Sequence, residues 1–227
     1  MNKELSILLP GSFFEESYQS KLELLSEKNF DCVYLFDHTV NPSDGRKAMY
    51  EIKKAISLIQ NNSHYSFDLG LCVLNVNRRK LDLLFTKYIN PMLEIEKFRL
   101  GLGTGDNRYE KKIKEFSHDL DSIIFDLVNQ YKFSHEGRNL FIGGTSPKKI
   151  DLVKKYSIGV NQWLGDEKKL QALIDNIGNK KSFLGRFSHC QKTDILYSDL
   201  SSNFEKIFVL KDSDIEEFYS QVDKILL

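Results

Sequence analysis

The chain has 227 residues, 41% of them hydrophobic, and its 32 basic residues balance 32 acidic ones. A neutral chain lacks both the positive surface of a nucleic-acid binder and the polybasic segment of a membrane anchor. The opening apolar stretch is too short for a signal peptide and no apolar run is long enough to span a bilayer, so the sequence predicts one cytoplasmic domain over residues 1–227.

Apolar runs rich in Val, Ile, Leu and Phe alternate with charged segments that have helical spacing. In the first half of the chain, this pattern predicts strands over 5–11, 31–38, 67–75 and 98–105. The same half has predicted helices over 13–29, over 46–60, over 78–96 with a kink or a break at Pro91, and over 108–131.

The second half repeats the pattern. Strands are predicted over 139–146, 158–165, 182–190 and 206–210, and helices over 147–156, 166–177 and 214–226. Strands that are almost wholly apolar and alternate with helices indicate a parallel sheet covered on both faces. Eight such units predict an α/β fold, a compact (β/α)8 TIM barrel with short connecting loops; an open doubly wound sheet is the alternative.

The cysteines and two of the histidines are interpreted as structural residues. Cys32, Cys72 and Cys190 lie far apart and form no C-x-x-C pair, so we expect reduced thiols in the core. His64 lies in a polar connection and His118 in a predicted helix, and both are expected to face solvent. Without an H-E-x-x-H motif or a carboxylate cluster, no metal site is predicted.

In a (β/α)8 barrel, functional residues gather at the C-terminal ends of the strands. Here those ends carry small or polar residues: Pro10–Ser12, Asp37–His38, Asn75, Thr104–Asp106, Gly143–Thr145 and Ser188–His189. Such residues also end strands for structural reasons, and Asp37 could cap a helix while His38 lies in a loop.

The stretch "IGGTSPKK", residues 142–149, is typical of an anion site. Gly143 and Gly144 let the backbone approach a ligand, Thr145 or Ser146 can cap the following helix, and Pro147 fits its first turn. The helix then offers free amide groups to a phosphate. A plain strand-to-helix turn is the alternative.

The stretch "LGLGTGD", residues 100–106, is not a dinucleotide fingerprint, because Asp106 stands where the third glycine is required. Thr104 and Gly105 could still contact a phosphate or a ring edge. The sequence has no G-x-S-x-G motif and no other obvious nucleophile. A phosphate site with one or two imidazoles and no nucleophile indicates a cofactor that carries the chemistry itself.

Several stretches resemble the bacterial-luciferase-like family of flavin- and deazaflavin-dependent oxidoreductases. They are "FDCVYLFDH", "RLGLGTGD", "YKFSHEGRNL" and "LFIGGTSPKKIDLVKKYSIGVNQWL", which follow one another in the family's order within residues 1–165. The chain is shorter than family members, which usually exceed 300 residues. It also has Ile158–Gly159 where the family has Asp-Gly, and the match fades after residue 165.

The resemblance implies a barrel that binds FMN or coenzyme F420, with the phosphate on loops that include Thr104, Gly105 and Gly143–Thr145. It implies that His38 lies beside the reactive ring and handles the proton that accompanies hydride transfer. Asp37 would orient the imidazole or bond to the ring. Cys72–Val73 would be the family's non-prolyl cis pair behind the ring, with Asn75 as a further cofactor-binding residue at the end of that strand.

The resemblance favours an FMN- or F420-dependent oxidoreductase or monooxygenase that transfers hydride between the ring and a small organic substrate. One alternative is a non-catalytic flavin- or deazaflavin-binding protein with a shortened barrel. A phosphosugar-binding barrel is a weaker alternative, because such barrels usually hold phosphate after strands seven and eight. Relatives pair through helices near the second and third units, so a homodimer is expected, with the apolar face of helix 46–60 in the interface.

Overall fold

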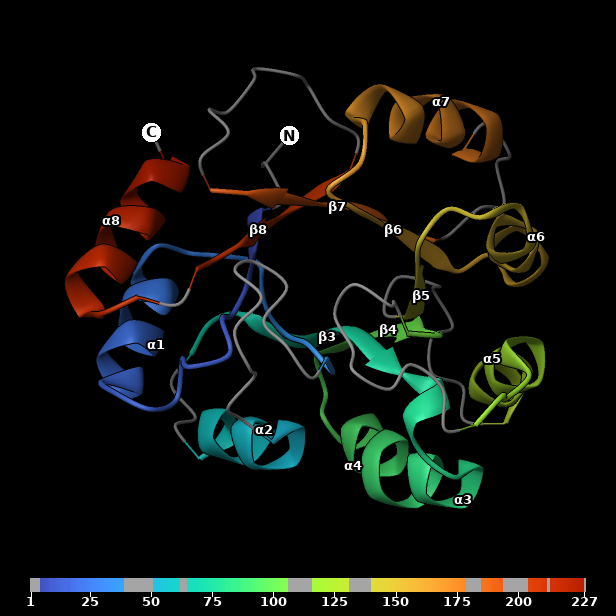
Figure 1. Cartoon of the computed structure of the whole chain (residues 1–227), viewed down its shortest axis with the longest axis horizontal. Coiled ribbons are helices and arrows are strands. Elements are labelled where there is room, and N and C mark those ends of the chain that lie inside the picture. Colours follow the sequence, from blue (N-terminus) through green and yellow to red (C-terminus); the bar gives the residue numbers. More distant parts are fainter. Residues whose placement is uncertain are drawn as a thin grey trace.

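The structure is a computed structural model that describes residues 5–38, 51–61, 65–105, 116–130, 140–178, 185–193, 204–211 and 213–226. Eight parallel strands form a closed barrel in sequence order (Figure 1). They are β1 (Leu5–Leu8), β2 (Cys32–Leu35), β3 (Asp68–Asn75), β4 (Phe98–Gly103), β5 (Leu140–Gly143), β6 (Gly159–Trp163), β7 (Phe187–Lys192) and β8 (Glu205–Val209). Pairing of β1 with β8 closes the sheet, which confirms the TIM-like barrel and excludes the open sheet.

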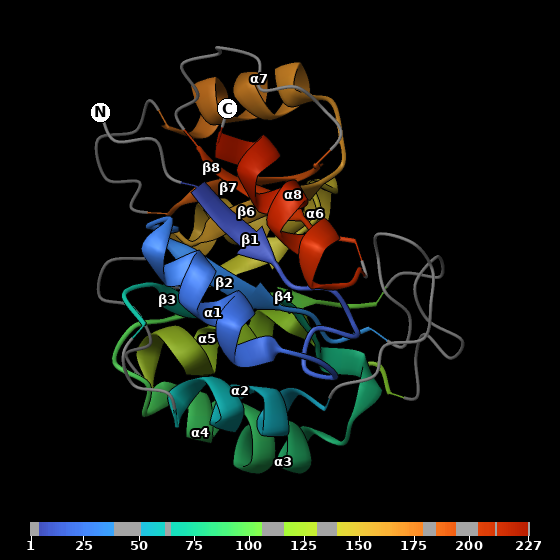
Figure 2. The same cartoon turned by 90° about the vertical axis from the view of Figure 1, so that its left-hand side faces the viewer.

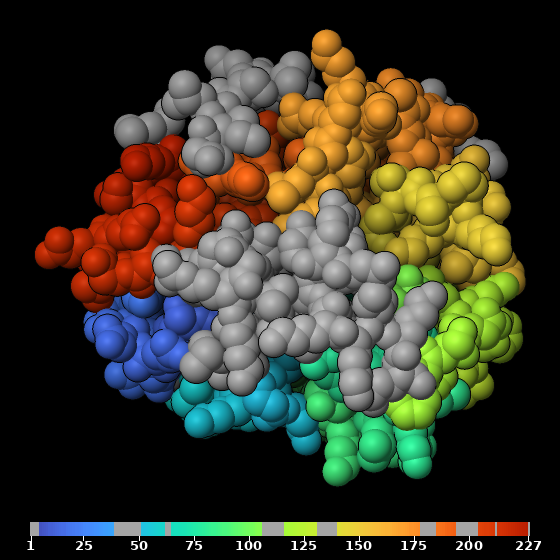
Figure 3. Space-filling model, viewed as in Figure 1, coloured from blue at the N-terminus to red at the C-terminus, as the bar shows by residue number. Residues whose placement is uncertain are grey.

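Helices surround the barrel (Figures 1 and 2) and follow one another around its rim in sequence order (Figure 3). They are α1 (Tyr18–Glu27), α2 (Ile52–Gln60), α3 (Leu81–Leu84), α4 (Asn90–Leu93), α5 (Leu120–Asn129), α6 (Pro147–Tyr156), α7 (Glu167–Gly178) and α8 (Ile215–Leu226). A short 3-10 helix, η1 (Val76–Arg78), follows β3. Within the described ranges, none of the helices has both the length and the apolar composition that crossing a bilayer requires.

The core has two parts, because successive side chains of a strand point to opposite faces of the sheet. The larger part lies between the strands and the helices. The smaller part fills the barrel and consists mainly of Leu8, Cys32, Tyr34, Phe36, Cys72, Phe141, Cys190, Ile207 and Val209. All three cysteines are therefore buried free thiols inside the barrel, in agreement with the sequence interpretation.

Several predicted helices begin later than expected, and α1, predicted from residue 13, begins at Tyr18. The described part of 46–60 is helical only from Ile52, because Glu51 is extended and its carboxylate accepts a bond from the Lys53 amide as an N-cap. The helix predicted over 108–131 begins at Leu120 after the cap Asp119. Residues 46–50 and 108–115 lie outside the described part of the chain.

The segment before Leu120 corrects the interpretation of His118. This residue is not helical and is partly buried. Its Nε2 lies 2.6 Å from the carbonyl oxygen of Arg79, and its amide donates to Oδ1 of Asn77. His118 therefore connects this segment to the end of β3 instead of facing solvent from a helix. His64 lies outside the described residues.

Pro91 does not break its helix. Residues 81–93 are continuously helical, with a π-turn at Phe85–Ile89 just before the proline. Proline has no amide hydrogen to donate to the carbonyl of Lys87 four residues earlier, and a π-turn lets the helix pass such a position. Among the strands, β7 continues to Lys192, two residues beyond its predicted end at Cys190.

The apolar face of α2 is used within the single chain. Ile52, Ala55, Ile56 and Ile59 are all buried in the core around the barrel. The homodimer expected from the sequence stays a prediction, and the residues on which it relied already have partners in their own chain.

Candidate functional site

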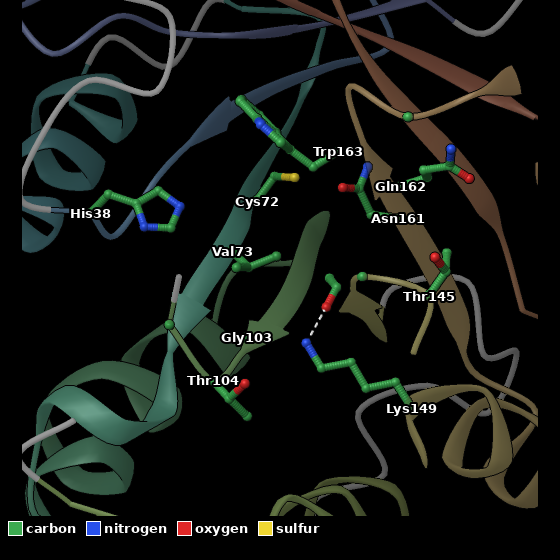
Figure 4. Close-up of a pocket in the computed structure, with 14 residues that line it drawn as sticks. His38, Cys72, Val73, Gly103, Thr104, Thr145, Lys149, Asn161, Gln162 and Trp163 are labelled. Atoms are coloured by element: carbon green, nitrogen blue, oxygen red, sulfur yellow. Dashed lines mark hydrogen bonds between the residues drawn. The ribbon is translucent and has the colours of Figure 1, made fainter. Parts of the chain in front are cut away.

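A cavity of about 300 Å³ lies at the C-terminal ends of the strands (Figure 4). Strands β3, β4, β5 and β6 contribute side chains or backbone to it, as do the segments that directly follow β2 and β5. Its lining consists of His38, Cys72, Val73, Gly103–Gly105, Gly143–Thr145, Lys149, Asn161–Trp163 and Gly165.

Most of the site residues named from the sequence meet in this cavity. His38, Cys72, Val73, Thr104, Gly105, Gly143, Gly144 and Thr145 line it, whereas Asp37 and Asn75 are not in its lining. The peptide bond between Cys72 and Val73 is cis, as the resemblance implies. Four stretches separated by up to about a hundred residues are thus brought together by the register of the strands.

Asp37 belongs to an ion cluster instead of the cavity lining. Its carboxylate, only 3% exposed, accepts bonds from Arg78 Nη1 at 2.8 Å and from both terminal nitrogens of Arg79 at 2.5 and 2.8 Å. Its Oδ2 also accepts from the Asn75 amide at 3.0 Å. The carboxylate therefore fastens the end of β2 to the end of β3, which fixes the backbone next to His38.

Asn75 has a local structural role. Its side chain is fully buried, and its Oδ1 accepts a bond from the Asn77 amide at 3.0 Å. This is an N-cap for η1, the turn of 3-10 helix that carries Arg78. Asn75 thus ends β3 with a polar side chain, as predicted from the sequence, but its carboxamide oxygen is bonded to the turn that follows.

His38 lies at one side of the cavity, with Val73 between it and Asn161 (Figure 4). Its ring is partly buried and stacks on Phe36, with centroids 6.0 Å apart and planes 26° from parallel. The stacking and the ion cluster at Asp37 hold the imidazole at the edge of the cavity.

Val73 forms the floor between two glycines. A Cβ atom at Gly103 would lie 2.4 Å from Val73 Cγ2, and one at Gly143 would lie 2.9 Å from Val73 Cγ1. Any side chain at Gly103 would therefore displace Val73. Close packing with Val73 explains both glycines, and it produces a smooth apolar surface at the centre of the cavity.

Gly144 is required by its backbone conformation. Its φ of +94° is strained for any residue with a side chain, and its amide donates to the Asn161 carbonyl oxygen at 2.8 Å. This amide thus extends the pairing of β5 with β6. The cap residue Ser146 makes no side-chain bond to the first turn of α6.

Lys149 brings a positive charge to this end of the cavity. Its Nζ donates to the Gly143 carbonyl oxygen at 2.5 Å, and the residue is partly buried. His38 and Lys149 are the basic residues of the lining, and among the described lining residues none is an acid. This charge pattern favours an anionic ligand.

Cys72 does not supply a nucleophile. Its Sγ lies 3.8 Å from Cys190 Sγ, and both side chains are buried. The hydrogen bond with Cys190 and the burial raise the pKa of the Cys72 thiol well above its ordinary value. The thiol form persists at neutral pH, and only a thiolate would be reactive.

Sequence reasoning missed four side chains of the lining: Lys149, Asn161, Gln162 and Trp163. Lys149 lies within the stretch interpreted as an anion site, but the sequence argument assigned the anion to the glycines and the helix amides and not to a lysine. The other three form the end of β6, where the general rule for barrel strands predicts functional residues.

No protein-family model matches this chain, and no curated protein is similar to it. Its structure is similar to an F420-dependent secondary alcohol dehydrogenase in complex with an F420–acetone adduct, with a TM-score of 0.55, 12% identity, and coverage of 100% of this chain and 82% of that chain. It is also similar to the coenzyme F420-dependent tetrahydromethanopterin reductase from Methanopyrus kandleri, with a TM-score of 0.57, 11% identity and coverage of 85% and 67%. A third similar structure is apo-MsnO8, with a TM-score of 0.58, 13% identity and coverage of 84% and 65%.

The chain shares the TIM-barrel fold of these structures. The resemblance seen in the sequence is thereby confirmed at the level of the fold. At identities of 11–13%, the structural similarity concerns the architecture and leaves the ligand and the reaction to be argued from the cavity itself.

Proposed function

We propose that the protein binds a deazaflavin or flavin coenzyme in this cavity and transfers hydride between the ring and a small organic substrate. The observation that carries the proposal is the meeting of eight residues, named from four separate stretches of sequence, around one cavity. We expect coenzyme F420 as the ligand in preference to FMN, because two of the structurally similar proteins depend on F420.

The floor of the cavity suits a planar ring. Val73, flanked by Gly103 and Gly143, offers an apolar surface without projecting side chains on either side. The volume of about 300 Å³ lies at the lower end of the range for small-molecule sites. A ring system with part of its side chain fits such a space.

The α6 end of the cavity suits the phosphate. Lys149 supplies a cation, Thr145 a hydroxyl group, and the first turn of α6 lacks a side-chain cap. Amide groups at an uncapped helix start and the positive end of the helix dipole both favour an anion. Lys149 would bind the phosphate most strongly, because it combines charge with a position fixed by the Gly143 carbonyl oxygen.

His38 is the group that holds or moves a proton in this proposal. The bound coenzyme would supply the two-electron chemistry, and the protein would supply orientation and proton transfer. Imidazole suits this task because it gives and takes protons near neutral pH. Phe36 and the Asp37 ion cluster keep it in place at the edge of the cavity.

The test is the substitution His38→Ala, with Tyr219→Ala, which removes an exposed ring on α8, as a control away from the cavity. We expect His38→Ala to slow the single-turnover reduction of bound coenzyme by about 10²–10⁴-fold, because that is the typical loss when a positioned acid or base is removed. The coenzyme dissociation constant should change little in either variant. An unchanged rate in His38→Ala would contradict the catalytic role of this histidine.

A non-catalytic coenzyme-binding protein is the second candidate. The chain spans 67% of the reductase and 65% of MsnO8, so parts of those proteins have no counterpart in it. Tight coenzyme binding, without reduction or reoxidation of the bound ring by a range of small alcohols, aldehydes and ketones, would favour this candidate.

A further inference from the structure

Asn161 presents a carboxamide whose orientation is fixed by its neighbours. The residue is 2% exposed and belongs to the cavity lining. Its Nδ2 donates to Ser188 Oγ at 3.0 Å and to Cys190 Sγ at 3.4 Å. Its backbone oxygen is bonded to the Gly144 amide. Both hydrogens of the carboxamide nitrogen are thus directed toward β7, which determines where the oxygen points.

The carboxamide oxygen retains capacity for a stronger partner. It accepts a bond from the Cys190 thiol at 3.6 Å. A thiol is a weak donor, and a carboxamide oxygen has two lone pairs. Figure 4 shows this oxygen turned toward the side of the cavity where Cys72 and Val73 lie. A ligand N–H group in the cavity would therefore meet a buried, pre-oriented acceptor.

We propose that Asn161 recognises the imide N–H of the coenzyme ring. This inference rests on the proposed function, since it assigns a contact to the coenzyme proposed above. Flavins and deazaflavins share an imide edge, in which one N–H group lies between two carbonyl groups. A single acceptor that is fixed in place is complementary to the centre of that edge, so the inference holds for FMN and F420 alike.

The placement of Asn161 agrees with this assignment. The phosphate is assigned to the α6 end near Lys149, and the reactive part of the ring to the side of His38. Asn161 lies across Val73 from His38, on the side that β6 and β7 form (Figure 4). The imide is one of the two ends of the tricyclic ring that carry neither the phosphate chain nor the reactive atom, and it is the end whose N–H group matches an acceptor.

The test measures dissociation constants of four probes: FMN, coenzyme F420, and each of these methylated at the imide nitrogen. The methyl group removes the one N–H in question. In the wild-type protein, methylation should weaken binding about tenfold, as expected for the loss of one buried hydrogen bond. In Asn161→Leu this penalty should shrink to within about twofold, because the acceptor is gone.

Two further variants keep the test decisive. Asn161→Asp retains an oxygen acceptor and should keep the methylation penalty, even if overall affinity falls or Asn161→Leu fails to fold. Gln191→Leu removes a buried carboxamide on β7, one residue from Cys190 and on the other face of the strand, and should keep the penalty as well.

The outcomes separate this inference from the proposed function. If none of the four probes binds the wild-type protein, both are overturned. If the probes bind but methylation costs nothing in the wild type, or costs the same in Asn161→Leu, only the role of Asn161 is overturned. When Asn161→Leu does not fold, an absent penalty in Asn161→Asp overturns that role too.

Discussion

The N-terminal end of the barrel and the cavity at its C-terminal end differ in how their charged residues are paired. At the N-terminal end, Glu205 is 1% exposed and accepts bonds from Arg99 Nη1 at 2.7 Å and from the Tyr34 hydroxyl at 3.2 Å. Arg99 also pairs with Asp68 at 2.6 Å. At the C-terminal end, Asn161, His38 and Lys149 surround an open cavity.

The difference shows which polar residues serve the fold and which are available to a ligand. At the closed end, Arg99 is paired with both Asp68 and Glu205, and Glu205 is buried. At the open end, the lining contains the basic residues His38 and Lys149, and none of its described residues is an acid. This agrees with the general division of (β/α)8 barrels into a stabilising N-terminal face and a functional C-terminal face.

Breaking the closed end should have the largest effect on stability. The substitution Arg99→Met leaves Glu205 buried without its main counter-ion, and such a change typically costs about 3–5 kcal/mol of unfolding free energy. Urea denaturation measures this loss. Coenzyme affinity of the remaining folded protein should stay the same, because the ion pair lies at the opposite end of the strands from the cavity.

A double variant distinguishes a buried unpaired charge from lost packing. In Arg99→Met with Glu205→Leu, both charges are removed, and at least half of the lost stability should return. Equal stability of Arg99→Met and the wild type would show that the Arg99–Glu205 pair does not hold the closed end together.

Raising the pH should have the next largest effect on stability, and this effect also arises at the closed end. Burial raises the pKa of the Cys32 thiol well above 9.0 and that of the Tyr34 hydroxyl well above 10.0. The unfolded chain releases these protons above its ordinary pKa values while the folded protein retains them, so stability is complete below about pH 9 and falls as the pH rises. The slope is about 1.4 kcal/mol per pH unit for each such group.

Denaturant midpoints measured from pH 8 upward test this expectation, with Tyr34→Phe as the comparison. Because phenylalanine has no proton to lose, the variant should show a shallower decline above about pH 10. A stability that stays level through this range in the wild-type protein would contradict the burial of these groups.

Removing the charge at the open end should affect binding and not folding. Lys149→Met should weaken coenzyme binding about tenfold, since it removes a positioned cation from the proposed phosphate site. Unfolding free energy should change by less than about 1 kcal/mol, as for most partly exposed substitutions. Lys154→Met, the same change in the exposed last turn of α6, should leave affinity unaltered. Identical losses in both variants would indicate a general effect of net charge.

The architecture could be predicted from the sequence because its determinants are local. Each strand is a short apolar run and each helix an amphipathic one, and eight repeats of the pair leave few ways to close the sheet. The cavity lining followed from the same logic, since residues such as His38 and Gly143 directly end their strands. The late start of α5 at Leu120 was missed, because contacts of His118 with the end of β3 compete with helix formation there.

The pairing of side chains could not be predicted, because it depends on contacts between distant parts of the chain. Asp37 meets Arg78 and Arg79 about forty residues later, and Asn161 meets Ser188 on the next strand. Residue 103 must be glycine because a Cβ atom there would lie 2.4 Å from Val73 Cγ2, and only the register of β3 and β4 reveals this contact. Spacing along the sequence carries no trace of these contacts.

Trp163 allows the central claim to be tested in the unmodified protein. It is the single tryptophan of the chain, and it lines the cavity next to Gln162. A coenzyme ring bound in the cavity would lie close to the indole and quench its fluorescence strongly, whereas binding on a distant surface would quench it less.

The measurement is a titration of tryptophan fluorescence with F420 and, separately, with FMN, corrected for absorbance with free tryptophan and compared with equilibrium dialysis. The account predicts saturable quenching with a stoichiometry of one coenzyme per chain and the same dissociation constant by both methods. The account would be contradicted if neither coenzyme bound at about 100 µM. This concentration would reveal any binding free energy more favourable than roughly −5.5 kcal/mol. Binding by dialysis that leaves the emission of Trp163 unchanged would also contradict the account.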